Sequence, residues 1–321
     1  MNVTRRSTLL ALGAVASNPA GAQTIAWSDR PIRLIAGFAP GGPADVVARI
    51  IADHLGQRWP VPVVVENRVG AGGNIASQFV ARSRPDGAVA LVATTSFAVN
   101  PAVSSRAGYR LDDFAPAAVL ASTPNIVLAH PSFEPRNIED ILTFSRKRPL
   151  NIGVPGLGTS GHLSVDRLFR VLAKADVQFI PFNGAGPVLS ALLARQIDLG
   201  QMAMNSAVEQ VRSGAVRGVV VNSPRRAKAL PDVPTAAELG YPTAVDATWL
   251  ALLFPARTPP DILLRANEDV AGALQDPVVL RRLEGNGFEP LGGTLEETER
   301  HMRDEFTMWA EVARQTGITL D

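Results

Sequence analysis

Four glycine-bearing segments are the places where this sequence offers chemistry through its backbone. They are APGGPAD (39–45), NRVGAGGN (67–74), PGLGTSGH (155–162) and FNGAGP (182–187), and each falls where a strand-like run meets a helix-like run. Glycine lets the chain turn sharply and approach a ligand closely, and the first amides of a helix attract anions. The pattern predicts anion sites, with tight strand-to-helix turns as the alternative.

The APGGPAD segment favours a carboxylate over a phosphate. Pro43 suits the first helical position and leaves the amides of Ala44 and Asp45 at the positive end of the helix. A phosphate loop would have the pattern G-x-x-x-x-G-K-[ST], and no lysine follows the glycines here. Asp45 has a structural interpretation as a stabilising first-turn acid. FNGAGP repeats this arrangement, so two glycine loops are expected to face one cleft.

The segment GLGTSG (156–161) matches the dinucleotide pattern G-x-G-x-x-G. A dinucleotide site also needs an acid at the end of the following strand, but the expected strand VQFIPF ends in Phe182 and is followed by Asn183. This argues against a dinucleotide. Thr159 and Ser160 offer hydroxyl donors that suit a small carboxylate.

His162 is the residue that most resembles a catalytic base. A hydrolase would need a nucleophile beside it and an acid to orient it, but Ser160 is two residues away and does not face it on a helix. The sequence has no G-x-S-x-G elbow and no cysteine, and its four histidines are far apart. His162 is therefore predicted to cap the helix, with ligand contact or a hinge role as the alternative. We predict no enzyme, no cofactor and no metal site.

Composition and the first residues indicate an exported protein. The chain of 321 residues has a net charge of +1, no block of like charge and a mean hydropathy of +0.11, which argue against nucleic-acid binding and a membrane-embedded body. Residues 1–22 combine Arg5-Arg6, a short apolar run and Ala20-Gly21-Ala22, which predicts an export signal. The arginine pair resembles a twin-arginine signal; an ordinary secretory signal is the alternative.

The rest of the chain predicts an α/β fold with two tandem units. Strand-like and helix-like runs alternate from residue 31 to residue 96 and again from 151 to 222, which favours mostly parallel sheets flanked by helices. Apolar runs at 114–131 and 247–256 are predicted to cross between the units. We expect one discontinuous lobe (27–123 plus 250–321), a second lobe (124–249) and a ligand cleft between them.

Seven segments together resemble a known family, the Bug solute receptors of tripartite tricarboxylate transporters. In order, they are PIRLIAGFAPGGPADVVAR, VVVENRVGAGGNIA, RPDG, GTSGHL, PFNGAGP, ALPDVPTAAELGYP and TWLALLFPARTPP. The resemblance runs from about Trp27 to the C-terminus. It implies a two-lobed type II periplasmic binding protein, or Venus flytrap, that captures a small mono-, di- or tricarboxylate or an amino acid.

The resemblance also implies which residues contact the ligand. They are Phe38, Ala39, Gly41, Gly42, Ala44, Asp45, Thr95 and Ser96 in the first lobe, and Thr159, Ser160, His162, Asn183, Gly184, Ala185 and Asn205 in the second. Three positions depart from the family: Phe182-Asn183 stands where Tyr-Lys is frequent, Ala191 where an acid is usual, and Leu157 where Asn is frequent. These departures favour a less polar distal pocket.

The implied partner is the membrane permease of a tripartite tricarboxylate transporter, and the implied state is a periplasmic monomer. The ectodomain of a sensor kinase is the alternative partner. An exported α/β enzyme is a second hypothesis, but it lacks a visible nucleophile–base pair or metal cluster. An exported scaffold without a ligand is a third, and it predicts a filled cleft.

Overall fold

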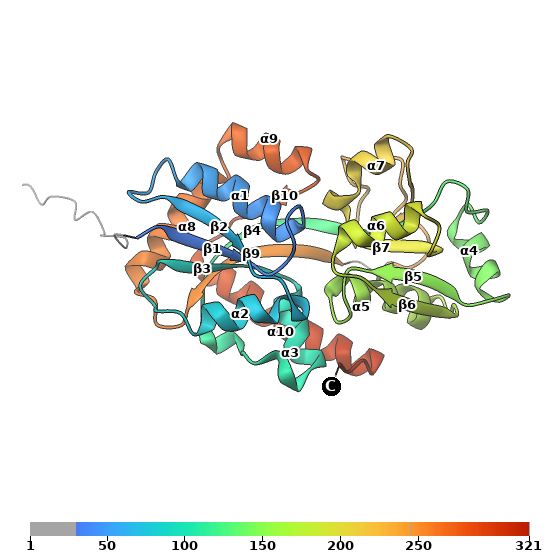
Figure 1. Cartoon of the computed structure of the whole chain (residues 1–321), viewed down its shortest axis with the longest axis horizontal. Coiled ribbons are helices and arrows are strands. Elements are labelled where there is room, and N and C mark those ends of the chain that lie inside the picture. The colour runs from blue at the N-terminus through green and yellow to red at the C-terminus, as the bar shows by residue number, and fades with distance from the viewer. Residues whose placement is uncertain (1–29, 245, 321) are drawn as a thin grey trace, which may run out of the picture.

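The computed structural model of the protein describes residues 30–244 and 246–320 and has two lobes joined by long strands (Figure 1). The predicted export signal at residues 1–22 lies outside the described residues. The lobe on the left of Figure 1 contains the early and late parts of the chain, and the lobe on the right contains its middle. Within the described part, no helix combines the length and apolarity needed to cross a bilayer.

Parallel strands form the sheet of the first lobe. They are β1 (Ile32–Ala36), β2 (Val63–Asn67) and β3 (Val89–Thr94). β1 lies between the other two and pairs with both. β1 and β3 are almost completely buried, as expected of apolar parallel strands that helices cover on both faces.

Helices cover both faces of that sheet. One face carries α1 (Pro43–Leu55), α8 (Pro260–Ala273) and α9 (Pro277–Gly285), and the other carries α2 (Asn74–Ala81), α3 (Ser96–Val103) and α10 (Leu295–Thr316). α1 shows why these segments fold as they do. Its Val47, Ile50, Ile51 and Leu55 have the spacing i, i+3, i+4 and i+8, form one apolar face and are buried.

The second lobe repeats this design, again with three parallel strands. β5 (Leu150–Val154) pairs in parallel with β6 (Val177–Pro181) and β7 (Leu199–Ala203). The remaining elements are β8 (Arg217–Val221), α4 (Ile138–Ser145), α5 (Ser160–Asp166), α6 (Ala185–Leu193) and α7 (Val208–Arg212). Two apolar clusters fill the lobe, one packed against α4 and α5 and the other against α6 and α7.

Two antiparallel strands run through both lobes. β4 (Phe114–Ala129) pairs with β9 (Ala247–Pro255) over its first part and with β7 and β8 over its last part. β9 also pairs with β3, so the strand order is β2-β1-β3-β9-β4-β7-β5-β6. β9 and β4 lie between the two expected parallel sheets. They pair antiparallel with each other, with β3 on one side and with β7 on the other, so that all these strands form one mixed sheet.

Several elements differ from the sequence-based expectation. One of the helix-like runs of the second unit, residues 162–175, falls in α5 and a six-residue π-helical segment that follows it, η4 (Arg167–Leu172). The expectation did not include α3, α4 or α9; α3 is nearly all apolar and has no clear polar face. The remaining short elements are η1 (Ala71–Gly73), η2 (Ser105–Ala107), η3 (Leu111–Asp113), η5 (Met204–Ser206) and β10 (Glu289–Pro290), which pairs with β4.

Candidate functional site

A cavity of about 310 Å³ lies between the lobes at the carboxyl ends of the parallel strands. Loops that follow β1, β3, β5 and β6 form its walls, and β4, β7 and β9 contribute side chains. Ligands of open α/β sheets bind in this position. Of the predicted residues, the cavity is lined by Phe38, Ala39, Gly41, Gly42, Ser96, Thr159, Ser160, Asn183, Gly184 and Ala185.

The other five predicted residues lie outside the cavity wall. Ala44 is completely buried in the core of the first lobe. The Thr95 hydroxyl donates to the carbonyl of Ala247 at 3.2 Å and accepts from the Trp249 amide at 3.0 Å, so it ties the start of α3 to β9. Asn205 lies in η5, beside the lining residue Ser206. The remaining two, Asp45 and His162, do not line the cavity but accept hydrogen bonds from loops that do.

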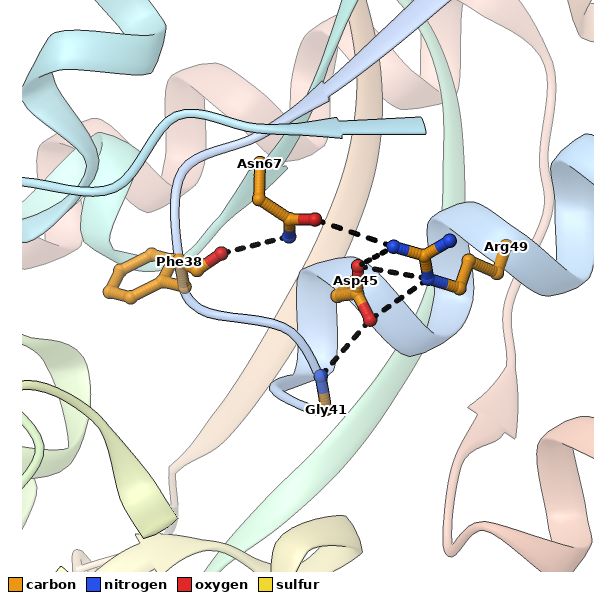
Figure 2. A network of polar contacts seen from close by, with 5 residues as sticks. All are labelled: Phe38, Gly41, Asp45, Arg49 and Asn67. Carbon is orange, nitrogen blue, oxygen red and sulfur yellow. Dashed lines mark hydrogen bonds and ion pairs between the residues drawn. The ribbon is translucent and has the colours of Figure 1, made fainter. Parts of the chain in front are cut away.

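Asp45 holds the APGGPAD loop in shape (Figure 2). Its Oδ2 accepts the amide N–H of Gly41 at 3.0 Å, and both carboxylate oxygens accept hydrogen bonds from Arg49 at 2.8–3.1 Å. Asn67 at the end of β2 continues the network, since its Nδ2 donates to the Phe38 carbonyl at 2.9 Å. The loop is therefore held from two sides by side chains that do not line the cavity.

This network decides which groups of the first loop are free to bind. The Gly41 amide is occupied by Asp45, and the Gly42 amide donates to the Ala39 carbonyl at 3.2 Å. Burial alone would raise the pKa of Asp45, but hydrogen bonds from Arg49, the Gly41 amide and Asn67 outweigh it and hold that pKa below its usual value. Asp45 is therefore ionised across the neutral range and is already paired.

His162 supports the PGLGTSGH loop in a comparable way. Its Nδ1 accepts the Gly158 amide N–H at 3.2 Å, so the ring proton is on Nε2 in the neutral form. Burial, and secondarily the charge of Arg170, lowers the pKa of His162 to about 4. The ring also meets Phe179 edge to face, with centroids 4.8 Å apart. These contacts make His162 a support for the loop, whereas Thr159 is the N-cap of the helix.

The hydroxyls of this loop differ in availability. Thr159 is the N-cap of α5: its Oγ1 accepts from the His162 amide at 3.2 Å and donates to the Gly156 carbonyl at 2.9 Å. Both hydroxyl roles are thus already used. The Oγ atoms of Ser96 and Ser160, both at the cavity, have no hydrogen-bond partner recorded within the described chain. The Ser206 hydroxyl, also at the cavity, is likewise without a partner among the described residues.

The FNGAGP loop forms the opposite wall with its backbone. α6 begins at Ala185, and its first amides lack an intrahelical acceptor. Gly184 has φ +110° and ψ 177°, a conformation that essentially only glycine adopts. Within the described residues, no side-chain hydrogen bond supports 183–187. Phe182 and Ala191, two of the departures noted in the sequence, pack in the apolar interior, and Leu157 is exposed outside the cavity.

Sequence reasoning missed a polar group on the central strands. Besides prolines and small residues, the cavity is lined by the polar side chains of Thr94, Asn125, Gln201, Ser206 and Thr248. Asn125 and Gln201 each interrupt an apolar run, NIVLA or LGQMA, and Thr248 falls in TWLALLF. A buried polar residue inside an apolar strand was the available signal, because such a group requires a partner.

The electrostatics of the cavity are unusual for an anion site. Among the described residues that line it, none has a charged side chain. Serine hydroxyls, side-chain amides and helix-start amides are the polar groups available, and prolines and Phe38 supply apolar surface. No group of three or more His, Cys, Asp or Glu side chains in the described chain is arranged to hold a metal ion. The site is thus suited to a small molecule held by neutral hydrogen-bond donors and dipoles.

Comparison with known proteins places the chain in a family. The family model "Tripartite tricarboxylate transporter family receptor" (TctC) matches residues 47–318. Protein BugT of Bordetella pertussis is 32% identical over 326 residues, which covers 100% of both chains. The chain belongs to the TctC family, which the sequence resemblance had identified correctly.

Two solved structures of similar proteins hold ligands. One is a Rhodopseudomonas palustris protein with adipate, which is 31% identical, has a TM-score of 0.86 and aligns over 92% of this chain and 99% of its own. The other is MatC of the same organism with bound malate, at 31% identity and a TM-score of 0.81, over 88% and 99% of the two chains. These similarities confirm the predicted two-lobed binding-protein fold.

Proposed function

We propose that this protein captures a small organic carboxylate between its lobes and delivers it to the permease of a tripartite tricarboxylate-type transporter. The observation that carries the proposal is the uncharged cavity of about 310 Å³ at the carboxyl ends of strands from both lobes. Family membership and the adipate and malate bound by similar proteins support the ligand class. We place the protein in the periplasm, since its family consists of transporter receptors and its first residues carry an export pattern.

We further propose how the ligand is held. The first amides of α6 in the FNGAGP loop and the hydroxyls of Ser96 and Ser160 bind one carboxylate against the APGGPAD loop, while Asn183 faces the distal part of the ligand. Asp45 and His162 act indirectly, by fixing the loops. Binding by neutral dipoles supports release, because a receptor that passes on its cargo needs moderate affinity and lobe closure rather than a tight ion pair.

We propose that the lobes divide as the sequence predicts, at residues 123–124 and 249–250. The switch of β4 from β9 to β7 and β8 supports this division. Ligand supplies the free-energy difference between the open and closed arrangements. No catalytic step is part of the proposal, because the cavity has no nucleophile–base pair among its described lining residues.

Thermal unfolding against a panel of acids tests this function. A ligand present at about 100 times its Kd stabilises the folded state by about 2.7 kcal/mol, which raises Tm by several degrees. The panel contains citrate, succinate, adipate, aspartate, glutamate, nicotinate, benzoate and terephthalate, applied to protein refolded to remove retained ligand. A shift with one chemical class supports the proposal, and Ser160→Ala should reduce it. A flat panel with verified ligand-free protein refutes it.

A further inference from the structure

A chain of three polar side chains leads away from the ligand cavity. Gln201 on β7 and Asn125 on β4 both line the cavity, and each has only 1% of its surface exposed. Gln201 Nε2 donates to Asn125 Oδ1 at 3.1 Å, and Asn125 Nδ2 donates to Asp246 Oδ2 at 2.7 Å. Asp246 precedes β9 and does not line the ligand cavity. A carboxylate outside the site is therefore joined to it through two amides.

Asp246 faces a second cavity, of about 320 Å³, which shares no described lining residue with the first. The charged and titratable side chains there are Arg167 of η4 and His301 and Glu305 of α10. Besides Asn125, Asp246 accepts hydrogen bonds from Ser164 and from the Ala247 amide. Burial raises the pKa of Asp246 to about 7; the charge of Glu305 adds to this rise, and the three hydrogen bonds oppose it.

The ionised form of Asp246 fixes the direction of the hydrogen bonds that link Asp246, Asn125 and Gln201. An ionised carboxylate can only accept hydrogen bonds, so Asn125 must turn its Nδ2 toward Asp246. Its Oδ1 then faces the cavity side, where Gln201 Nε2 and, at 3.4 Å, the Thr248 hydroxyl donate to it. The amide nitrogen of Gln201 is therefore used in its hydrogen bond to Asn125, and the Gln201 Oε1 remains as the atom without a hydrogen-bond partner.

The leftover oxygen is a buried acceptor without a partner. Gln201 Oε1 is inaccessible and has no hydrogen-bond partner within the described chain. The amide lies against Gly161, another lining residue, where an added Cβ would come within 2.4 Å of Oε1. Only a residue without a side chain leaves room for this arrangement. The protein thus keeps a hydrogen-bond acceptor in the cavity wall that only a donor can satisfy.

We propose that Asp246, acting through Asn125, sets Gln201 as a hydrogen-bond acceptor in the ligand cavity, and that the natural ligand is therefore a carboxylate bearing a hydroxyl or ammonium donor. This inference rests on the proposed carboxylate-receptor function and narrows its ligand class. A hydroxy or amino acid pairs with Gln201 Oε1, whereas an unsubstituted acid leaves it buried and unpaired. Leaving a buried acceptor unpaired costs enough to weaken binding by about tenfold or more.

Matched acids that differ by one hydroxyl test the inference. Isothermal titration calorimetry on the ligand-free protein would compare malate with succinate, 2-hydroxyglutarate with glutarate, 2-hydroxyadipate with adipate, and mandelate with phenylacetate. In the pair that fits the cavity, the hydroxy acid should bind at least about tenfold more tightly. Equal or weaker binding of the hydroxy acid overturns the inference and leaves the carboxylate receptor intact. If none of the eight binds, while the wider panel also fails, the proposed function itself is refuted.

Variants then separate the positioning role of Asp246 from simple destabilisation. The readout is the affinity ratio between the two acids of a pair, which a merely structural change would leave constant. Asp246→Asn removes the constraint on direction, because an amide can also donate to Asn125, and should reduce the ratio to about threefold or less. Gln201→Met, which removes the acceptor directly, should abolish the preference. Retention of the full ratio in either variant overturns the assignment.

Glu305→Gln is the matched control. It removes a charge from the same second cavity and keeps an acceptor for the indole N–H of Trp309, which Glu305 accepts at 2.9 Å, but it is not part of the chain. Its affinity ratio should equal that of the parent protein. The affinity ratio of the parent protein should also be larger at pH 8 than at pH 6. A protonated Asp246 carboxyl can donate to Asn125, and the amides of Asn125 and Gln201 are then no longer restricted to one orientation. The Asp246→Asn ratio should not change with pH, and a His301→Gln variant should keep the pH effect. Glu305→Gln should move the pH effect to lower pH, because the charge of Glu305 raises the pKa of Asp246.

Discussion

The two glycine loops that end in proline look alike in sequence but are held differently. APGGPAD in the first lobe is fixed by the buried carboxylate of Asp45, by Arg49 and by Asn67. FNGAGP in the second lobe has no such side-chain support among the described residues, and its Gly184 adopts a strained conformation for any other residue. Side-chain hydrogen bonds thus fix the conformation of the first loop, whereas the conformation of the second loop is determined by its backbone alone. Under the proposed function, we expect the first loop to keep its shape and the second loop to adjust when ligand binds.

The largest effect is expected from a charge placed on the second loop. Asn183→Asp puts an anion into a cavity whose described lining has none, and like charges at close range cost several kcal/mol. Carboxylate affinity should fall by about 100-fold, or about 2.7 kcal/mol, with little change in the stability of the free protein. Calorimetric titration measures it. Leu157→Asp, at an exposed position outside the cavity, is the control, and an equal loss in that variant would contradict the local explanation.

A second effect should come from the glycine conformation. Gly184→Ala forces a side chain into φ +110° and should lower the free energy of unfolding by about 1–3 kcal/mol. Gly186→Ala is matched, since Gly186 lies in α6 with open space around its Cα, and should raise stability by about 0.5–1 kcal/mol. Urea unfolding compares the two. If both variants lose stability equally, the strain at Gly184 does not decide the conformation of the loop.

Removal of the first-lobe support should have a smaller effect. Asp45→Ala removes the charged acceptor of the Gly41 amide and frees the loop, at a cost of about 1–2 kcal/mol in stability and about tenfold in affinity. Because half of the Arg49 side chain is exposed, its ion pair alone contributes little. Asp45→Asn should therefore retain most of the affinity. Urea unfolding and titration of both variants check this, and an equal loss in both would assign the effect to charge instead.

A last comparison concerns the pH response of the two lobes. Asp45, with its lowered pKa, stays charged above pH 5, so the first loop should not respond near neutrality. His162 binds a proton only below about pH 4 when folded but near pH 6.5 when unfolded, so its contribution to stability rises with pH across that interval. Asp246, with a folded pKa of about 7 against about 3.9 unfolded, gives a contribution that falls as pH rises from about 4 to 7.

Two variants can separate these opposing pH dependences of the free energy of unfolding. His162→Asn should remove the rise between pH 4 and 6.5, and Asp246→Asn should remove the fall, each by up to about 1.4 kcal/mol per pH unit. Free energies of unfolding from urea curves at several pH values give the slopes. Parallel curves for the parent protein and Asp246→Asn between pH 5 and 7 would show that Asp246 does not titrate in this range.

The sequence predicted backbone features better than side-chain partnerships. The glycine loops after β1, β5 and β6 lie at the cavity because glycine, proline and apolar periodicity act over a few neighbouring residues. The role of Asp45 depended on Arg49 and Gly41, each four residues away, a local spacing that the sequence reading did not use. The role of Thr95 depended on the distant β9, which no local pattern reveals. Asn125, Gln201 and Asp246 are far apart in sequence and meet only because β4, β7 and β9 cross between the lobes. The fold follows from local signals, whereas the polar chain follows from topology.

The continuity of β4 also has a practical meaning for protein engineering. One strand of 16 residues supplies hydrogen bonds to both lobes, so neither lobe can be cut out as a single gene segment without exposing an open sheet edge. A fluorescent reporter built from this protein therefore needs the intact chain. Dyes are best attached to the opposing loops at residues such as Val69 and Leu157, which are exposed and lie outside the ligand cavity.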